Sequence, residues 1–235
     1  MTLCKTARWL LVGNSRWHWA EQGRDGRLRG WDGAASEDGG EGVFPLAWAA
    51  VGPSPDPRIC PPERQVGLAD VPLLDCPPWL GVDRALAGWG AWQELGASVL
   101  VVDGGTVLSL TRVDGGGSFQ GGRLLAGLRL QLEAMGQGTN LIPQILNQSW
   151  REAPPDDPSW PQATAAAMQV GVERGLAAAI SEAAREAGSR WVVFTGGDGG
   201  RLHEQGAQQL ERLGLSVAHR PLLCLESLAR LRPAS

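Results

Sequence analysis

A meander of three short strands followed by a helix is predicted for the middle of the chain, and it constrains the fold more than any other segment. The β-branched apolar run Val99–Val102 is too short for a globular helix and predicts a buried strand. Clusters of Asp and Gly then predict turns before two further strands, Val107–Val113 and Ser118–Leu124. Apolar residues at helical spacing over Leu125–Met135, with glycines after them, predict the helix.

The turn after the first of these strands has the residues of a phosphate or cation site. Asp103 ends the strand, and Gly104, Gly105 and Thr106 follow it. Glycine lets a phosphate approach the main chain, where exposed N–H groups and the hydroxyl can bind it, and the carboxylate can hold a cation beside it. Asp-Gly turns are also common in ordinary hairpins, so these four residues alone leave a purely structural role equally open.

The same pattern occurs near the start of the chain. Arg8–Val12 and Arg16–Ala20 are predicted strands, and Gly13, Asn14 and Ser15 form the turn between them. The two copies lie about 90 residues apart, which is too far for a solenoid repeat and about right for two related domains. Two phosphate-type turns would then face each other across a cleft.

A long helix is predicted over Thr164–Ala187, which is rich in alanine. Its large apolar residues recur at a four-residue step that marks one buried face: Met168, Val172, Leu176 and Ile180. We assign Gly171 and Gly175 to the same face. Because each glycine costs a helix about 1 kcal/mol, their presence favours a close packing partner there.

A glycine-rich turn follows the next predicted strand, Trp191–Phe194. The turn Thr195–Gly200 lies at the carboxyl end of that strand, which is a usual location for a nucleotide in α/β proteins. Its spacing matches neither the dinucleotide fingerprint nor the Walker motif. A helix with Leu202 and Leu210, a strand around Val217 and a helix over Pro221–Leu231 are predicted to end the chain.

Three other segments are predicted to connect these elements. Gln22–Gly42 is rich in Gly, Asp and Arg, which favours a mobile hairpin or a loop. Leu46–Val51 is a predicted short strand before the proline-rich run Pro53–Pro62, which is incompatible with regular structure. Asn147–Pro161, with four prolines, is predicted to be a surface loop or the entry to the next helix.

Composition excludes several classes of protein. The formal charge is -4 and the chain has no basic cluster, which argues against a nucleic-acid partner. The four cysteines contain no CxxC pair and the three histidines are scattered in sequence, so a zinc site is not predicted. No apolar run reaches membrane-spanning length. We expect a soluble, cytoplasmic protein in a reducing compartment.

A candidate catalytic carboxylate precedes the predicted helix Ala85–Leu95. Asp83 and Arg84 follow Gly81 and Val82 at the junction between a proline-containing loop and this helix. Aspartate is also favoured in the first turn of any helix, because it caps the turn and complements the macrodipole. From the residues alone, this structural role is the stronger interpretation of Asp83.

Seven short motifs, in order and at consistent spacing over almost the whole chain, resemble those of the type III pantothenate kinases. They are Gly13-Asn14-Ser15-Arg16, Gly81-Val82-Asp83-Arg84, Asp103-Gly104-Gly105-Thr106, Gly121-Gly122 with Gly127-Leu128, Gln137-Gly138-Thr139, Thr164 with Ala167-Met168 and Gly171, and Thr195-Gly196-Gly197-Asp198.

The resemblance implies an α/β fold of two ribonuclease-H-like domains, as in the acetate and sugar kinase, Hsp70 and actin superfamily. We place the N-terminal domain, with the first phosphate loop, at residues 1–97. The C-terminal domain, with the second phosphate turn and the nucleotide turn, is placed at residues 98–235. The active site of such proteins lies in the cleft between the domains, which agrees with the duplicated turn.

By the same resemblance, pantothenate would be bound by Gly81, Val82, Asp83, Arg84 and Thr164. Asp83 would be the general base for the 4′-hydroxyl. Phosphoryl transfer needs in-line positioning, neutralised phosphate charge and a carboxylate within reach of the attacking hydroxyl, and Asp83 is suited to that task. The residues do not decide whether Arg84 would anchor the carboxylate of pantothenate or steady Asp83.

ATP, with Mg²⁺, would be bound at three turns. The resemblance places Gly13, Asn14, Ser15 and Arg16 in the first phosphate loop, Thr106 on an ATP phosphate, and Gly196 and Gly197 near the adenosine. Asp103 matches the position that binds a monovalent cation, K⁺ or NH₄⁺.

The resemblance implies ATP-dependent phosphorylation of pantothenate in coenzyme A biosynthesis, by a homodimer. The family's first phosphate loop usually has an aspartate two residues before the glycine, and Leu11 stands there in this chain. Because leucine cannot hold magnesium, a non-catalytic binding or regulatory protein of the same fold is the alternative. A kinase for another small alcohol or sugar is a third and weaker possibility, because the Gly-x-Asp-Arg element is particular to the type III pattern.

Overall fold

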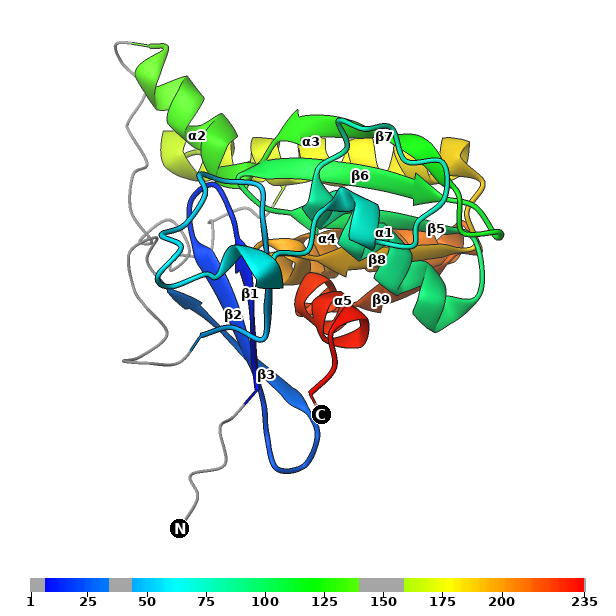
Figure 1. The fold of residues 1–235 in the computed structure, drawn as a ribbon. Helices are drawn as coiled ribbons and strands as arrows, with labels where there is room; N and C mark the ends of the chain where they lie inside the picture. Colours follow the sequence, from blue (N-terminus) through cyan, green and yellow to red (C-terminus); the bar gives the residue numbers. More distant parts are fainter. Residues whose placement is uncertain (1–6, 34–43, 140–158, 235) are drawn as a thin grey trace. The chain divides into compact units, whose positions relative to one another are not determined.

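The computed structural model describes residues 7–33, 44–139 and 159–234. They form two compact units. The first contains the described parts of Met1–Val99 together with Thr111–Gly121 and Leu222–Ser235, and the second contains Leu100–Leu110 and the described parts of Gly122–Pro221. The units are therefore built from interleaved segments of the chain (Figure 1).

The first unit contains a four-stranded sheet with the order β3-β2-β1-β4. Its strands are β1 (Arg8–Val12), β2 (Trp17–Gln22), β3 (Leu28–Gly33) and β4 (Ala47–Ala50). The pairs β1–β2 and β2–β3 are antiparallel, and β1–β4 is parallel. One face carries the large apolar side chains that alternate along β1 and β2, and these form a core of Leu10, Val12, Trp17, Trp19, Trp48 and Cys60.

Two helices pack against each other in this unit, α1 (Val82–Leu95) and α5 (Leu223–Leu231). Small residues permit the close approach, because a β-carbon on Gly90 would lie 3.3 Å from Ser227 Cβ. The α1 helix ends at Gly96, whose φ of 58° is the left-handed conformation that glycine adopts without strain. Two short 3₁₀ turns, η1 (Pro62–Arg64) and η2 (Leu68–Asp70), interrupt the connection that leads to α1.

A second sheet has five strands in the order β7-β6-β5-β8-β9. They are β5 (Val99–Gly104), β6 (Val107–Val113), β7 (Phe119–Ala126), β8 (Trp191–Thr195) and β9 (Ser216–His219). Its first four strands follow the same order as the four-stranded sheet, with the third, second, first and fourth strands side by side. The chain therefore contains the same strand order twice.

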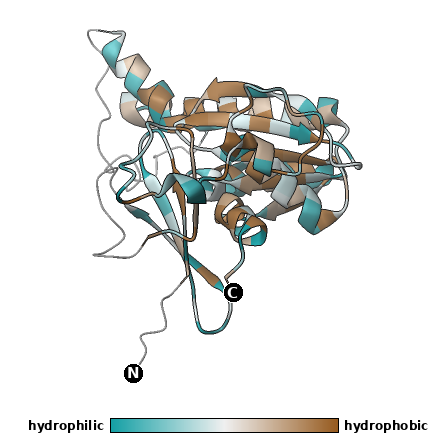
Figure 2. Cartoon of the chain, viewed as in Figure 1, coloured by the Kyte–Doolittle hydropathy of each residue, from teal (hydrophilic) through white to brown (hydrophobic). Residues whose placement is uncertain are grey.

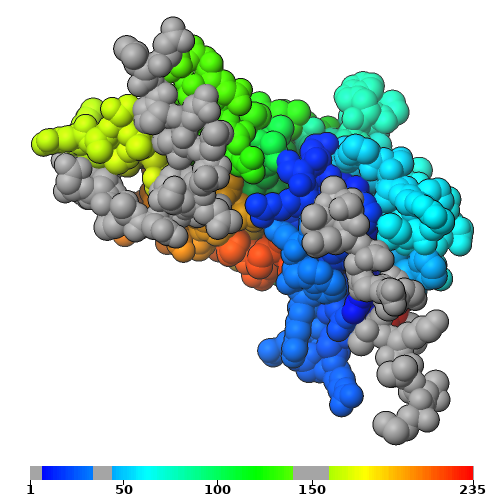
Figure 3. Space-filling view, turned by 90° about the vertical axis from the view of Figure 1, so that its left-hand side faces the viewer, coloured from blue at the N-terminus to red at the C-terminus, as the bar shows by residue number. Residues whose placement is uncertain are grey.

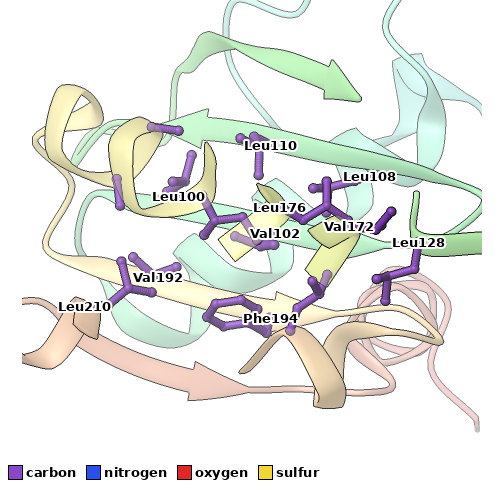
Figure 4. Packing of buried hydrophobic residues seen from close by; sticks show 14 of the residues in the cluster. Leu100, Val102, Leu108, Leu110, Leu128, Val172, Leu176, Val192, Phe194 and Leu210 are labelled. Carbon is purple, nitrogen blue, oxygen red and sulfur yellow. The ribbon is translucent and has the colours of Figure 1, made fainter. Parts of the chain in front are cut away.

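The core of the second unit lies between this sheet and the helices α2 (Leu128–Gln137), α3 (Thr164–Ala187) and α4 (Gly199–Arg212). Figure 4 shows Leu100, Val102, Leu108 and Leu110 of the strands with Val172 and Leu176 of α3, all of which are buried. The strands β5, β6 and β8 are mostly hydrophobic in Figure 2, as expected for buried strands.

The predicted strands and helices were confirmed within a few residues in the described parts of the chain. The strand β3 within Gln22–Gly42 makes a hairpin with β2, one of the two forms expected for that segment. In the space-filling view, this hairpin, coloured blue, lies at the surface (Figure 3). Most of the predicted loop Asn147–Pro161 lies outside the described residues.

The assignment of Gly171 and Gly175 to the buried face of α3 was wrong. Both are exposed, and a β-carbon on either would meet no atom within 4 Å. Each glycine stands one residue before an apolar residue of the buried stripe, which turns it about 100° away around the helix. Among the residues that the structure describes, no close packing partner explains these two glycines.

None of the helices in the described residues is long and apolar enough to cross a membrane.

Candidate functional site

Asp83 lies in the first turn of α1, one residue after the start of the helix. Its Oδ1 accepts a hydrogen bond of 2.8 Å from the backbone N–H of Arg84. A β-carbon on Gly81 would lie 2.5 Å from the same oxygen, so only glycine fits at that position while the carboxylate keeps this orientation. The N-terminal turn of the helix thus holds the carboxylate in place through its own backbone.

Burial raises the pKa of Asp83, and the hydrogen bond and positive charge of Arg84 oppose that change only in part. A carboxylate with a raised pKa is a stronger proton acceptor than an exposed one. Perturbed carboxyl groups of this kind are typical of functional sites, although structural ion pairs perturb pKa values too.

The Arg84 side chain contacts residues of β6 and β7. Its Nε donates to Thr111 Oγ1 at 3.2 Å, and its Cζ lies 5.6 Å from the ring centroid of Phe119. Burial lowers the pKa of Arg84, yet an arginine this basic stays charged. A fixed, half-buried guanidinium is suited to binding a carboxylate of a ligand.

The first predicted phosphate loop is a tight turn between β1 and β2. The N–H of Gly13 donates to the carbonyl of Arg16 at 3.0 Å, which closes the turn. Asn14, Ser15 and Arg16 are exposed at its tip. A β-carbon on Gly52 would lie 2.5 Å from Gly13 O, so the segment after β4 is also packed tightly against this turn.

The second predicted phosphate turn joins β5 to β6 and packs against the residue that precedes α2. Gly127 N–H donates to Thr106 O at 2.9 Å, and a β-carbon on Gly127 would overlap Gly105 O. Thr106 is exposed. Gly127 therefore helps to shape the turn, which explains why a glycine at this position belongs to the motifs of the resemblance.

The structure brings Asp103 and the glycine-rich turn after β8 together, because β5 and β8 are neighbours in the sheet. Asp198 N–H donates to Gly104 O at 2.8 Å. Gly196 has a φ of +81°, and a β-carbon there would overlap Asp103 Oδ1 and lie 2.8 Å from Gly104 O. These residues were predicted separately for a cation and for ATP, and they form one cluster at the carboxyl ends of two strands.

His203 of α4 and His219 of β9 meet beside the same turn. The rings of His203 and His219 stack with centroids 5.7 Å apart. A β-carbon on Gly200 would lie 3.2 Å from His219 Cε1, so the ring borders the glycine-rich turn. Burial lowers the pKa of His219, which favours its neutral form.

Thr164 is the first residue of α3 and is exposed. It belongs to the second unit, whereas Asp83 and Arg84 belong to the first.

The oxygen donors near Asp103 fit a hard cation better than a transition metal that prefers nitrogen or sulfur. Asp103 Oδ1 and the carbonyl of Gly104 both lie next to Gly196, and oxygen donors suit hard cations. Within the described residues, no three His, Cys, Asp or Glu side chains are placed to hold a metal ion together. At the first turn, Leu11 is buried and supplies no donor.

Sequence reasoning missed the contacts that Thr111, Phe119 and Asp198 make with the predicted site residues. None of them lies within a few residues of its partner in sequence. The alternation of side chains along paired strands is the signal that could have placed Thr111 and Phe119 on one face, once the register was known.

The family model and the similar sequences of known proteins indicate the same family. Residues 62–186 match the family model described as type III pantothenate kinase. A type III pantothenate kinase from Synechococcus elongatus is 34% identical over 213 residues, which cover 81% of this chain and 83% of the relative. One from Synechococcus sp. strain JA-2-3B'a(2-13) is 39% identical over 171 residues, covering 68% of this chain and 66% of the relative.

Solved structures with the same fold are much more distant in sequence. The activator of the 2-hydroxyisocaproyl-CoA dehydratase from Clostridium difficile, with bound ADPNP, has a TM-score of 0.53 and 12% identity, covering 96% of this chain and 93% of that one. Component A of the (R)-2-hydroxyglutaryl-CoA dehydratase from Acidaminococcus fermentans has a TM-score of 0.51 and 13% identity, covering 97% and 96%. These similarities show the fold expected from the sequence, that of the acetate and sugar kinase, Hsp70 and actin superfamily.

Proposed function

Because this chain belongs to the type III pantothenate kinase family, we propose that it transfers the γ-phosphoryl group of ATP to the 4′-hydroxyl of pantothenate. The product is 4′-phosphopantothenate, and the reaction is the first step of coenzyme A biosynthesis. The observation that carries the assignment of the site is the half-buried Asp83 carboxylate, held by the backbone at the start of α1.

Asp83 is the proposed general base. The proton of an alcohol becomes acidic as its oxygen bonds to phosphorus, so the base has to be near the hydroxyl but does not need an extreme pKa. Burial raises the pKa of Asp83 towards the range in which a base works well near neutral pH. Gly81 supports this role because it leaves room for the carboxylate.

Arg84 is the proposed anchor for the carboxylate of pantothenate. Its contacts with Thr111 and Phe119 hold the guanidinium in place, which supports a role in anchoring a ligand carboxylate. Gly81, Val82 and Thr164 are the other proposed contacts with pantothenate.

The proposed nucleotide contacts follow the turns. Gly13, Asn14, Ser15 and Arg16 of the first turn and the hydroxyl of Thr106 are the proposed contacts with phosphate, and Gly196 and Gly197 those with the adenosine end. Because the N–H of Gly13 closes the turn onto Arg16 O, the part of Gly13 is to let phosphate approach the main chain. Exposure of the turn tips and the glycine conformations support this assignment.

Two cations belong to the proposal. Asp103 is the proposed ligand for K⁺ or NH₄⁺, which would offset negative charge near the phosphates. Mg²⁺ would accompany ATP, held by the phosphates of the nucleotide, because Leu11 provides no oxygen donor. We also propose a cytoplasmic homodimer, as the resemblance implies.

The test is pantothenate-dependent release of ADP from ATP by the full chain, with Mg²⁺ and with potassium or ammonium compared with sodium. Asp83→Asn should lower kcat by at least about 100-fold, the usual worth of general-base catalysis. The matched control is Asp56→Asn, an exposed aspartate paired with Arg58 two residues away, and it should keep wild-type turnover. A folded wild-type protein that shows no turnover with any of these cations would support the non-catalytic alternative.

A further inference from the structure

A row of three side chains crosses the four-stranded sheet beside the first turn. Leu11 of β1 pairs with His18 of β2, and His18 pairs with Asp32 of β3. Residues directly opposite each other on paired strands lie on the same face of the sheet. Leu11, where related chains usually have an aspartate, is therefore in line with the imidazole of His18 and the carboxylate of Asp32.

Hydrogen bonding fixes the imidazole of His18 in this row. Its Nδ1 lies 2.7 Å from Asp32 Oδ1. The other nitrogen faces the turn, because a β-carbon on Gly13 would lie 3.4 Å from His18 Nε2. In the protonated imidazole both ring nitrogens donate, so Nδ1–H can bond the carboxylate while Nε2–H donates to an anion bound at the turn.

Arg16 joins the same carboxylate from the tip of the turn. Its Nη1 lies 3.6 Å from Asp32 Oδ2. One oxygen of Asp32 therefore contacts Arg16 and the other contacts His18. All three side chains are partly exposed, with 56% of Arg16, 35% of His18 and 46% of Asp32 accessible. They are positioned together and are still accessible to a ligand.

From this geometry we infer that His18 contacts the ATP phosphates at the first turn, together with Arg16, and that Asp32 is the positioning residue for both. The inference rests on the proposed binding of ATP at Gly13–Arg16. His18 and Arg16 would then neutralise phosphate charge at this turn. In a chain with an aspartate at the position of Leu11, a metal ion bound to that carboxylate would do so. No metal ligand on β1 is needed for this contact.

The first experiment is binding of AMP-PNP to the full chain with magnesium chelated, so that the protein's own groups carry the phosphate contact. His18→Asn retains a group at the position of Nδ1 but loses Nε2, and it should weaken binding about 10-fold, the worth of one charge-assisted hydrogen bond. His18→Gln places an amide near the position of Nε2 and should recover part of the affinity. Asp32→Asn should weaken binding as well.

The matched control is Glu21→Gln. Glu21 is also on β2 and makes a cross-strand ion pair of 2.7 Å with Arg8, but it lies at the other end of the strand. It should bind AMP-PNP like the wild type. Equal affinity in His18→Asn and the wild type, or an equal loss in Glu21→Gln, would overturn the inference.

Steady-state kinetics separate this inference from the proposed function. His18→Asn should raise KM for ATP about 10-fold with little change in KM for pantothenate, whereas loss of sheet structure would affect both. A wild-type protein that binds AMP-PNP but does not phosphorylate pantothenate would refute the proposed function, while the comparison of His18 variants in AMP-PNP binding would still decide the role of His18. A wild-type protein that does not bind AMP-PNP would refute the phosphate contact.

Discussion

Replacing Gly196 by alanine should damage the Asp103 cluster more than the general stability of the chain. Gly196 has a φ of +81°, and its β-carbon would overlap Asp103 Oδ1 and lie 2.8 Å from Gly104 O and 3.0 Å from Gly104 C. The carboxylate can rotate away from the new methyl group, but the backbone of β5 cannot. The variant therefore has to displace both the proposed cation ligand and the strand that carries it.

The size of the effect follows from two separate costs. An alanine in the left-handed conformation costs about 1 kcal/mol, and overpacking against backbone costs about 2 kcal/mol more. A total of about 3 kcal/mol should lower Tm by roughly 6–12 °C in a protein of this size. Stimulation of turnover by potassium should fall further than Tm predicts, because Asp103 is moved directly.

Gly214→Ala is the matched control for the conformational cost. Gly214 has the same φ of +81°, and a β-carbon at this position would meet no atom within 4 Å, so only the cost of the left-handed conformation remains. It should lower Tm by about 2–4 °C and leave the potassium response unchanged. The measurements are thermal unfolding and ADP release over a range of potassium concentrations. Equal Tm and equal potassium response in the two variants would refute the reasoning.

Three further predictions concern the first unit. Burial raises the pKa of Asp83, so the folded protein binds the carboxyl proton more tightly than the unfolded chain does. The free energy of unfolding therefore decreases as pH rises from the pKa of Asp83 in the unfolded chain to its pKa in the folded protein. Asp83→Asn should therefore unfold at the same or a higher temperature than the wild type at pH 7, while wild-type kcat should fall when acidification protonates Asp83. Arg84→Lys should raise KM for pantothenate about 10-fold with little change in KM for ATP, because lysine lacks the planar group that bonds Thr111. Gly90→Ala should lower the free energy of unfolding by about 1–3 kcal/mol, because its methyl group would overlap Ser227 Oγ, and adding Ser227→Ala should restore part of the loss.

Each of these predictions has a contrary result. A lower unfolding temperature for Asp83→Asn at pH 7 would show that ionised Asp83 stabilises the fold. An equal rise in KM for both substrates in Arg84→Lys would indicate general disturbance of the site. A Gly90→Ala loss that is unchanged in the double variant would place the strain elsewhere in the α1 and α5 contact.

Local sequence patterns determined the elements and several of their ends. Val99–Val102 was predicted as a strand from its β-branched residues, and Thr164–Ala187 was predicted with the bounds that the structure has. The glycine-containing turns after β1, β5 and β8 were also evident, because turn residues act within a few positions. The motifs at these turns carried the resemblance to the family that the comparisons then showed.

Only the tertiary structure decided which side chains meet. Asp103 and Gly196 lie together because β5 and β8 are adjacent, and His18 contacts Asp32 because of the register between β2 and β3. The register of paired strands depends on contacts between residues distant in sequence, and a shift by one residue would turn each side chain to the other face. The sequence by itself determined strands, helices, turns and family, whereas packing and register decided how the carboxylates, arginines and histidines of the candidate site are arranged.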